Sequence, residues 1–277
     1  MELKEYQRRV LERYDDYLKA LYAEKHKAEA AIKALQDAGV DIPDGMGDWP
    51  KNGWKKIESV LPRVRTPMGL RVPDYVTRYD ARKRSIPHIC LKVPTGGGKT
   101  LLAAECVGRV QTDFFKRQTG LVLWVVPTVQ IYTQTKKALF NRLHPYRQSL
   151  ERASGGRVKV LEKDDPFNSG DVENFLCVML VRLAATNRTS NKEFLRIFRD
   201  AGRYTSFFPE ADDYAANNAL LNAYPDLETN DLGDAGAIVG VSIKQSLVNA
   251  LKMLRPVVVI DEGHKAYSDN TRDSLNG

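Results

Sequence analysis

The chain has 277 residues, of which 43% are hydrophobic and 28% are charged, and its formal net charge is +7. This composition is ordinary for a globular protein with a sizeable core, and it excludes a low-complexity chain. No apolar run reaches the roughly 18–20 residues that span a bilayer, and the charged start lacks the pattern of a signal peptide. We therefore expect no membrane partner, whereas the positive charge favours a polyanionic one.

The three cysteines, Cys90, Cys106 and Cys177, are isolated and have no metal-type spacing. A reduced, cytoplasmic setting follows as the default. Cys90 and Cys177 lie within apolar runs, so they are expected to be small core residues.

Residues 1–86 predict a helical N-terminal arm followed by a loop-rich insertion. Apolar residues from Leu3 to Leu21 fall on one helical stripe, and a second helical stretch runs over residues 28–35 and stops at Gly39. Residues 41–84 are punctuated by proline and glycine, which predicts irregular structure. The insertion closes with four cations that either line a nucleic-acid path or, more simply, form a solvated face: Arg78, Arg82, Lys83 and Arg84.

A glycine-rich loop follows the apolar run at residues 88–92, which is predicted to be a short buried strand. Glycines without a Cβ let the backbone approach phosphate oxygens closely, at the start of a helix whose N–H groups face the anion. Lys99 supplies a positive charge for the β- and γ-phosphates of a nucleotide, and the Thr100 hydroxyl is a ligand for Mg²⁺. The predicted nucleotide-binding residues are Pro94, Thr95, Gly96, Gly97, Gly98, Lys99 and Thr100.

A second apolar run, Val257–Ile260, ends in two carboxylates and a histidine. Four β-branched residues in a row predict a strand that is buried on both faces of a parallel sheet. Ligands bind at the carboxyl ends of such strands. Asp261 is the predicted Mg²⁺ ligand, and Glu262 is predicted to orient the attacking water. His264 completes the candidate catalytic set of Lys99, Asp261, Glu262 and His264.

The remaining elements predict an α/β fold over residues 87–277. Strands are expected at 121–126, 158–161, 175–181, 237–243 and 257–260, with helices at 129–143 and 245–254. Strands that alternate with helices in this way predict a parallel sheet with helices on both faces. An acidic stretch at about 205–235 is expected to be an exposed, loop-rich insertion.

Pro94–Thr100 together with Asp261–His264 resembles motifs I and II of the DEAD/DEAH-like helicases of superfamily two. The nearest relatives by pattern are type III restriction enzyme Res subunits and helicase N-terminal ATP-binding domains. Gly263 stands where the best-known variants of motif II carry Ala or Pro. The resemblance implies a RecA-like P-loop NTPase lobe that uses ATP and Mg²⁺.

Three further stretches are similar to elements of the same family. Lys4–Gln7 resembles the element in which a glutamine reads adenine, which implies that role for Gln7. The run from Val125 resembles motif Ia, which implies nucleic-acid contacts for Pro127, Thr128 and Gln130. Residues 240–245 resemble the segment just upstream of motif II.

The function that these patterns favour is that of an ATP-hydrolysing motor lobe of a DNA helicase or translocase of the type III restriction kind. The implied partners are double-stranded DNA, a methyltransferase subunit and a second RecA-like lobe that this chain lacks. Because that lobe supplies arginines to the transferring phosphoryl group, we expect a fragment that hydrolyses ATP slowly alone. An RNA helicase lobe and a non-catalytic nucleotide-binding module are the alternatives.

Overall fold

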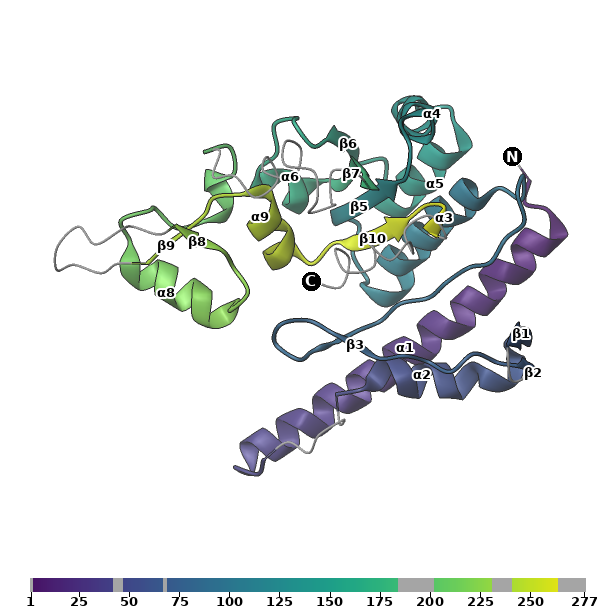
Figure 1. Cartoon of the computed structure of the whole chain (residues 1–277), viewed down its shortest axis with the longest axis horizontal. Helices are drawn as coiled ribbons and strands as arrows, with labels where there is room; N and C mark the ends of the chain where they lie inside the picture. The colour runs from purple at the N-terminus through teal and green to yellow at the C-terminus, as the bar shows by residue number, and fades with distance from the viewer. Residues whose placement is uncertain (1, 42–46, 67–68, 184–201, 231–240, 264–277) are drawn as a thin grey trace. The chain divides into compact units, whose positions relative to one another are not determined.

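The computed structural model describes residues 2–41, 47–66, 69–183, 202–230 and 241–263 (Figure 1). The chain forms two compact units. The first comprises residues 1–98 and 109–116, and the second comprises residues 99–108 and 117–277. The division of the sequence into an N-terminal arm at 1–86 and a motor lobe at 87–277 stays a prediction.

Helix α1 (Glu5–Asp37) dominates the first unit. The prediction of two separate helices here was wrong, because residues 22–27 contain neither glycine nor proline and continue the helix without a break. The buried stripe includes Leu11, Tyr17, Leu18 and Leu21, as the periodicity predicted. The helix ends before Gly39, which adopts a left-handed φ of 67°.

The segment predicted to be irregular contains helix α2 (Trp49–Ile57), the 3₁₀ turn η1 (Glu58–Val60) and two short antiparallel pairs. These pairs are β1 (Val64–Thr66) with β2 (Gly69–Arg71) and β3 (Arg78–Tyr79) with β4 (Ser85–Ile86). Helix α2 packs closely on α1, since a Cβ at Gly53 would lie 3.2 Å from the Leu21 nitrogen. The rings of Tyr17 and Trp54 also pack edge to face, with their centroids 5.8 Å apart. The prediction of irregular structure was therefore wrong for these residues.

The run at residues 88–92 is not a strand, which corrects another prediction. The backbone groups of His88 are bound by tyrosine hydroxyls instead of by a neighbouring strand. Its N–H donates to the Tyr75 hydroxyl at 3.2 Å, and its carbonyl accepts from the Tyr17 hydroxyl at 3.3 Å. Cys90 is consequently exposed and not a core residue, whereas Cys106 and Cys177 are buried.

The second unit is built on a four-stranded parallel sheet with the order β10-β5-β7-β6. The strands are β5 (Gly120–Val126), β6 (Val158–Glu162), β7 (Leu176–Arg182) and β10 (Val257–Ile260). Strands β5 and β7 lie in the centre and are almost wholly buried, because apolar side chains cover both of their faces. The predicted α/β class is confirmed.

Helices cover both faces of this sheet. On one face, alternate residues such as Val122 and Trp124 pack against α3 (Lys99–Arg109), α4 (Val129–Phe140) and α5 (Pro145–Ser154). On the other, Leu121 and its alternates pack against α6 (Ser169–Asn174) and α9 (Leu247–Leu254). The predicted helix at 129–143 ends earlier than expected, since Asn141 leaves the helical conformation with ψ 107°.

Strand β10 lies at the edge of the sheet, so the prediction that it is buried on both faces was wrong. Val258 and Ile260 are 53% and 39% exposed. The described residues place a strand on only one side of β10, and its outward side chains therefore remain accessible.

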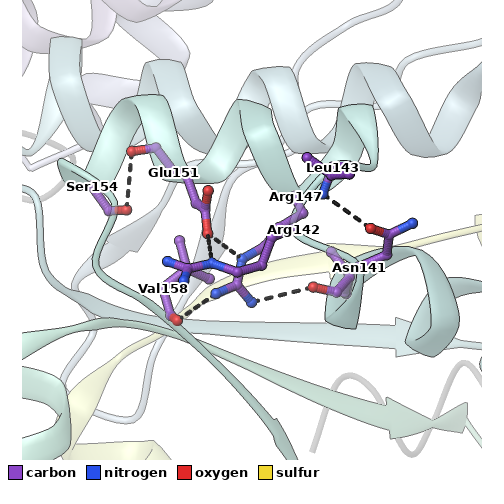
Figure 2. A network of polar contacts seen from close by, with 8 residues as sticks. Asn141, Arg142, Leu143, Arg147, Glu151, Ser154 and Val158 are labelled. Carbon is purple, nitrogen blue, oxygen red and sulfur yellow. Dashed lines mark hydrogen bonds and ion pairs between the residues drawn. The ribbon is translucent and has the colours of Figure 1, made fainter.

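A buried arginine joins α4, α5 and β6 (Figure 2). The Arg147 guanidinium donates to the Leu139 carbonyl at 3.2 Å, to the Val158 carbonyl at 2.8 Å and to Glu151 at 2.9 Å. Arg142 reaches the same Glu151 carboxylate from a side chain that is 73% exposed. These contacts hold the helical hairpin against the end of the sheet.

The acidic insertion is more ordered than the sequence predicted. It contains η4 (Thr205–Phe207), helix α8 (Tyr214–Ala223) and strand β8 (Thr229–Asn230). Strand β9 (Ser242–Ile243) pairs antiparallel with β8 and does not join the parallel sheet, and residues 237–240 of that predicted strand lie outside the described residues. The Asn217 side chain explains this order, because it donates to two backbone carbonyls and accepts from the Ile243 N–H at 3.2 Å.

Candidate active site

Helix α3 presents Lys99 and Thr100 in its first turn. The following residues anchor the helix, since Leu101, Leu102, Ala104 and Val107 are buried against the sheet or its surroundings. Lys99 and Thr100 therefore project from a helix whose position is fixed by the core. The free N–H groups at such a helix start favour an anion.

Strand β10 delivers the two carboxylates of the second motif. The Asp261 N–H donates to the Val125 carbonyl at 2.9 Å, which continues the parallel pairing of β10 and β5 by one more residue. The chain then turns, and Glu262 adopts a left-handed φ of 54°. Such a conformation is unfavourable for a residue with a Cβ, and residues of this kind gather at functional sites.

The two motifs meet although 161 residues separate Thr100 from Asp261 in the sequence. The Thr100 hydroxyl donates to Asp261 Oδ2 at 3.0 Å. Lys99 Nζ donates to both carboxylate oxygens of Glu262, at 3.0 and 3.1 Å. An ammonium, a hydroxyl and two carboxylates therefore converge at the carboxyl end of β10.

The surroundings of Asp261 raise the pKa of its carboxyl above the ordinary value. Burial raises the pKa of this carboxyl, and the Thr100 hydrogen bond and the Lys99 charge oppose that rise. Asp261 is 7% exposed, whereas the side chains of Lys99 and Glu262 retain 27% and 24% of their accessible area. The side chains of Lys99 and Glu262 are thus partly exposed, whereas Asp261 is buried.

The donor set of Thr100 and Asp261 suits a small hard cation. Mg²⁺ takes oxygen ligands, and it is usually held by one or two protein groups together with substrate phosphates and waters. Within the described parts of the chain, no three His, Cys, Asp or Glu side chains gather into a ready-made metal cage. The pair therefore fits a cation that arrives with a phosphate ligand.

The glycine loop has the backbone shape that its sequence predicted. Gly96 and Gly98 adopt left-handed φ values of 76° and 78°. At Gly97 a Cβ would lie 2.6 Å from Val93 Cγ1 and 2.8 Å from the Pro94 carbonyl, so no larger residue fits without a shift. Pro94 and Thr95 are exposed at the start of the loop.

Gln7, which the sequence assigned to adenine, lies against this loop and is 5% exposed. Its Nε2 donates to the Gly97 carbonyl at 3.0 Å, and its Oε1 accepts from the Lys4 N–H at 2.9 Å. Tyr6 donates its hydroxyl to the same Gly97 carbonyl at 2.7 Å. Sequence reasoning placed Tyr6 on the apolar stripe of the helix as a packing residue and within the stretch that resembles the adenine-reading element, and it predicted no contact with the glycine loop.

The predicted nucleic-acid residues follow β5 at the carboxyl edge of the sheet. The Thr128 side chain accepts from the Ile131 N–H at 3.3 Å and so caps α4. Pro127 is half-buried and Gln130 is exposed. His264 lies outside the described residues.

In the described part of the chain, no helix combines the length and the apolar character needed to cross a bilayer.

Comparison with known proteins identifies a family for the chain. A family model described as "Type III restriction enzyme, res subunit" matches residues 1–276. No curated protein and no solved structure matches the chain. Domains of this family are RecA-like, ATP-dependent motor domains of the helicase type. Because the match covers nearly the whole chain and includes both motifs, the protein belongs to the family of type III restriction enzyme Res subunits.

Proposed function

We propose that the chain is the ATP-binding and ATP-hydrolysing lobe of a DNA translocase or helicase of the type III restriction kind. The observation that carries the proposal is the meeting of Lys99 and Thr100 with Glu262 and Asp261. A phosphate-binding helix start and a pair of carboxylates at a strand end are the parts that phosphoanhydride hydrolysis needs. The reaction class is hydrolysis of the phosphoanhydride bond.

In this proposal each side chain has one task. Lys99 binds the β- and γ-phosphates, Thr100 and Asp261 hold Mg²⁺, and Glu262 orients the water that attacks. The cation would neutralise charge on the phosphates when it is bound. Since Glu262 now accepts from Lys99, nucleotide binding has to replace this ion pair with a pair between Lys99 and phosphate. The role of His264 stays a prediction from the motif.

Double-stranded DNA is the proposed track. The family description and the net charge of +7 support a polyanionic partner of this kind. Pro127, Thr128 and Gln130 are the proposed contacts to its backbone, because they lie at the carboxyl edge of the sheet. We further propose that a second RecA-like lobe supplies arginine to the transferring phosphoryl group, that a methyltransferase subunit selects the DNA site, and that the complex works in the cytoplasm.

Nucleotide binding tests the core of the proposal. Titration of the purified chain with Mg·ATP should give saturable binding that Lys99→Ala weakens by at least about tenfold, since a charged hydrogen bond contributes roughly 1.5–3 kcal/mol. Lys137→Ala, which removes an exposed lysine on α4, is the matched control and should bind as the unaltered chain does. Equal binding by both variants would reject the assignment of Lys99.

Hydrolysis separates an enzyme from a nucleotide-binding module. We expect slow turnover of Mg·ATP by the chain alone and faster turnover when a second RecA-like lobe is supplied, with Glu262→Gln inactive in both assays. ATP binding without any hydrolysis beside that lobe would favour the non-catalytic alternative.

Binding to duplex DNA and to duplex RNA of the same sequence distinguishes the two motor classes. Affinity measured at several salt concentrations should be higher for DNA, and Gln130→Ala should reduce it. Gln36→Ala, on the exposed surface of α1, is the control. Equal or tighter binding of RNA would favour the RNA helicase alternative.

A further inference from the structure

The positive charge of the chain is concentrated in one segment of the first unit. Residues 47–98 contain eleven lysine and arginine residues against four aspartate and glutamate residues, which gives a net charge of +7. This equals the net charge of the whole chain, so the rest of the sequence is neutral in sum. The net attraction of the chain for a polyanion therefore originates in this segment.

Within the segment, β3 and β4 form a hairpin whose base is anchored. Ser85 is buried in β4 and donates its hydroxyl to the Gly47 carbonyl at 2.7 Å. Thr77, which precedes β3, donates its hydroxyl to Asp48 Oδ2 at 2.7 Å. Gly47 and Asp48 lead directly into helix α2, so both strands of the hairpin are fixed at the start of that helix.

The turn of the hairpin, residues 80–84, is organised by one carboxylate. Asp80 Oδ1 accepts from the N–H groups of Arg82 and Arg84 at 3.0 and 2.8 Å, and Asp80 Oδ2 accepts from Arg84 Nε at 2.8 Å. The Lys83 N–H donates to the Asp80 carbonyl at 2.8 Å, and the Asp80 N–H donates to the Arg84 carbonyl at 3.0 Å. The turn therefore has a defined shape, and the Arg84 side chain is bound within it.

Arg82 and Lys83 stand at the tip of this turn, and both are exposed. The part of the chain that the structure describes supplies neither side chain with a carboxylate partner. Lys83 adopts a left-handed φ of 56°, at the position of such a turn where glycine is the usual residue. A lysine thus stands where the backbone favours glycine, and residues of this kind gather at functional sites.

We propose that the turn at residues 80–84 is a DNA-binding element outside the two motor motifs, in which Arg82 and Lys83 bind phosphates of a DNA duplex. The inference rests on the proposed DNA track and adds a contact site in the first unit. Lysine and arginine contacts to phosphate carry no sequence information. The element therefore holds a duplex of any sequence, which suits a protein that moves along DNA.

The salt dependence of binding counts such contacts. Each phosphate of a DNA duplex that a protein neutralises contributes roughly 0.9 to the slope of log affinity against log salt concentration. The experiment measures the affinity of the full chain for a DNA duplex of mixed sequence, by fluorescence anisotropy at several concentrations of potassium chloride. Arg82→Ala and Lys83→Gly should each weaken binding and reduce the slope by roughly 0.9, and the double variant should reduce it by roughly 1.8.

The variant Lys83→Gly separates the charge of the residue from its place in the fold. Glycine adopts the left-handed backbone without strain, so this variant should unfold at the same temperature as the unaltered chain or at a higher one. It should nevertheless bind DNA more weakly. A purely structural role of Lys83 predicts no loss of DNA affinity in this variant.

The double variant Lys27→Ala, Lys33→Ala is the matched control. Both lysines are exposed on α1, and their removal changes the net charge by the same two units. The control should keep the slope of the unaltered chain. All of these variants should bind Mg·ATP normally, because none of them alters the glycine loop or its carboxylate partners.

Two results would overturn the inference while the proposed function stands. One is an unchanged slope for the Arg82 and Lys83 double variant, which would point to an acidic protein surface as the partner of the turn. The other is an equal loss in the Lys27 and Lys33 control, which would show that total charge and not the turn determines binding. An unaltered chain that binds Mg·ATP but no DNA duplex would reject both the inference and the proposed DNA track.

Discussion

Lys99 and Glu262 form an ion pair in which two oxygens of one carboxylate accept from one ammonium, at 3.0 and 3.1 Å. A phosphate that approaches Lys99 has to displace this carboxylate and is repelled by its charge. Under the proposed function, Glu262 therefore opposes nucleotide binding while it assists hydrolysis.

The variant Glu262→Gln should accordingly bind Mg·ATP more tightly, by up to about fivefold, since a partly exposed ion pair contributes roughly 1 kcal/mol or less. The same variant should not hydrolyse ATP. Titration with Mg·ATP gives the affinity, and Glu173→Gln on the exposed surface of α6 is the control. Weaker binding by Glu262→Gln would contradict the argument.

At this scale the sequence predicted the residues of the two motifs, but not every contact that the structure places beside them. Lys99, Thr100, Asp261 and Glu262 follow from two short motifs whose spacing is local. The contact of Tyr6 with Gly97 spans 91 residues and depends on where α1 packs, which no local pattern records.

Arg147 stabilises a corner of the second unit at the scale of its elements. Its side chain is 10% exposed, and it binds two backbone carbonyls from α4 and β6 in addition to Glu151. Removing a buried donor of this kind leaves those carbonyls without a partner.

Arg147→Ala should lower the free energy of unfolding by roughly 2–4 kcal/mol, and Arg147→Lys should lose nearly as much because an ammonium cannot reach all three acceptors. Arg142→Ala, which removes the exposed arginine on the same Glu151 carboxylate, should cost less than about 0.5 kcal/mol. Unfolding in urea measures all three variants. Equal losses for Arg142→Ala and Arg147→Ala would show that burial is not what makes the contact strong.

Glu162, at the end of β6, ties that strand to α4. Its carboxylate accepts from Lys136 at 2.5 Å and from the Tyr132 hydroxyl at 2.6 Å. These hydrogen bonds, with the one from Lys136 having the larger effect, lower the pKa of Glu162 below its ordinary value. The ionised form is thus favoured in the folded chain.

A lowered pKa means that the stabilisation is fully present above the ordinary pKa of 4.5 and is lost as the pH falls through the lower folded-state value. At pH 7 the unaltered chain should be more stable than Glu162→Gln, by no more than about 1 kcal/mol because these side chains are partly exposed. The difference should shrink as the pH falls below 4.5. Urea unfolding at pH 7 and below pH 4.5 measures this difference in stability. A difference that grows in acid would contradict the lowered pKa of Glu162.

Some elements could be predicted from sequence and others could not. Strands β5 and β7 could be predicted, because each is a long apolar run and becomes a buried central strand. The run at residues 88–92 was also predicted to be a strand, but it has only three apolar residues between His88 and Lys92, and Tyr17 and Tyr75 bind the backbone of His88. Ordering of the acidic insertion depends on Asn217 and its partners, which a charge pattern does not reveal.

For the whole molecule, ligand binding and stability are linked. A ligand that binds only the folded chain stabilises it, by roughly 2.7 kcal/mol at a hundredfold excess over its dissociation constant. Mg·ATP should therefore raise the midpoint of thermal unfolding of the chain, and Lys99→Ala, with its affinity at least about tenfold weaker, should lose about half of this stabilisation or more. Lys137→Ala should retain it. A shift of the same size in Lys99→Ala would place the nucleotide elsewhere.

The α/β class and the family were predictable because both depend on strand runs and on two motifs. The organisation around them was not, since residues 47–66, 69–84 and 205–230 fold through contacts between distant side chains and carry little periodic signal. The division into two compact units cuts the chain between Gly98 and Lys99, within the motif that the sequence presents as one loop.

The left-handed backbone at Glu262 separates what folding favours from what chemistry requires. Glycine or asparagine would adopt this conformation at less energetic cost, by roughly 1 kcal/mol. When variants are selected only for solubility and thermal resistance, glutamate at position 262 should therefore be replaced in the first rounds of selection. Persistence of glutamate under such selection would mean that the acid contributes to the stability of the resting molecule as well as to turnover.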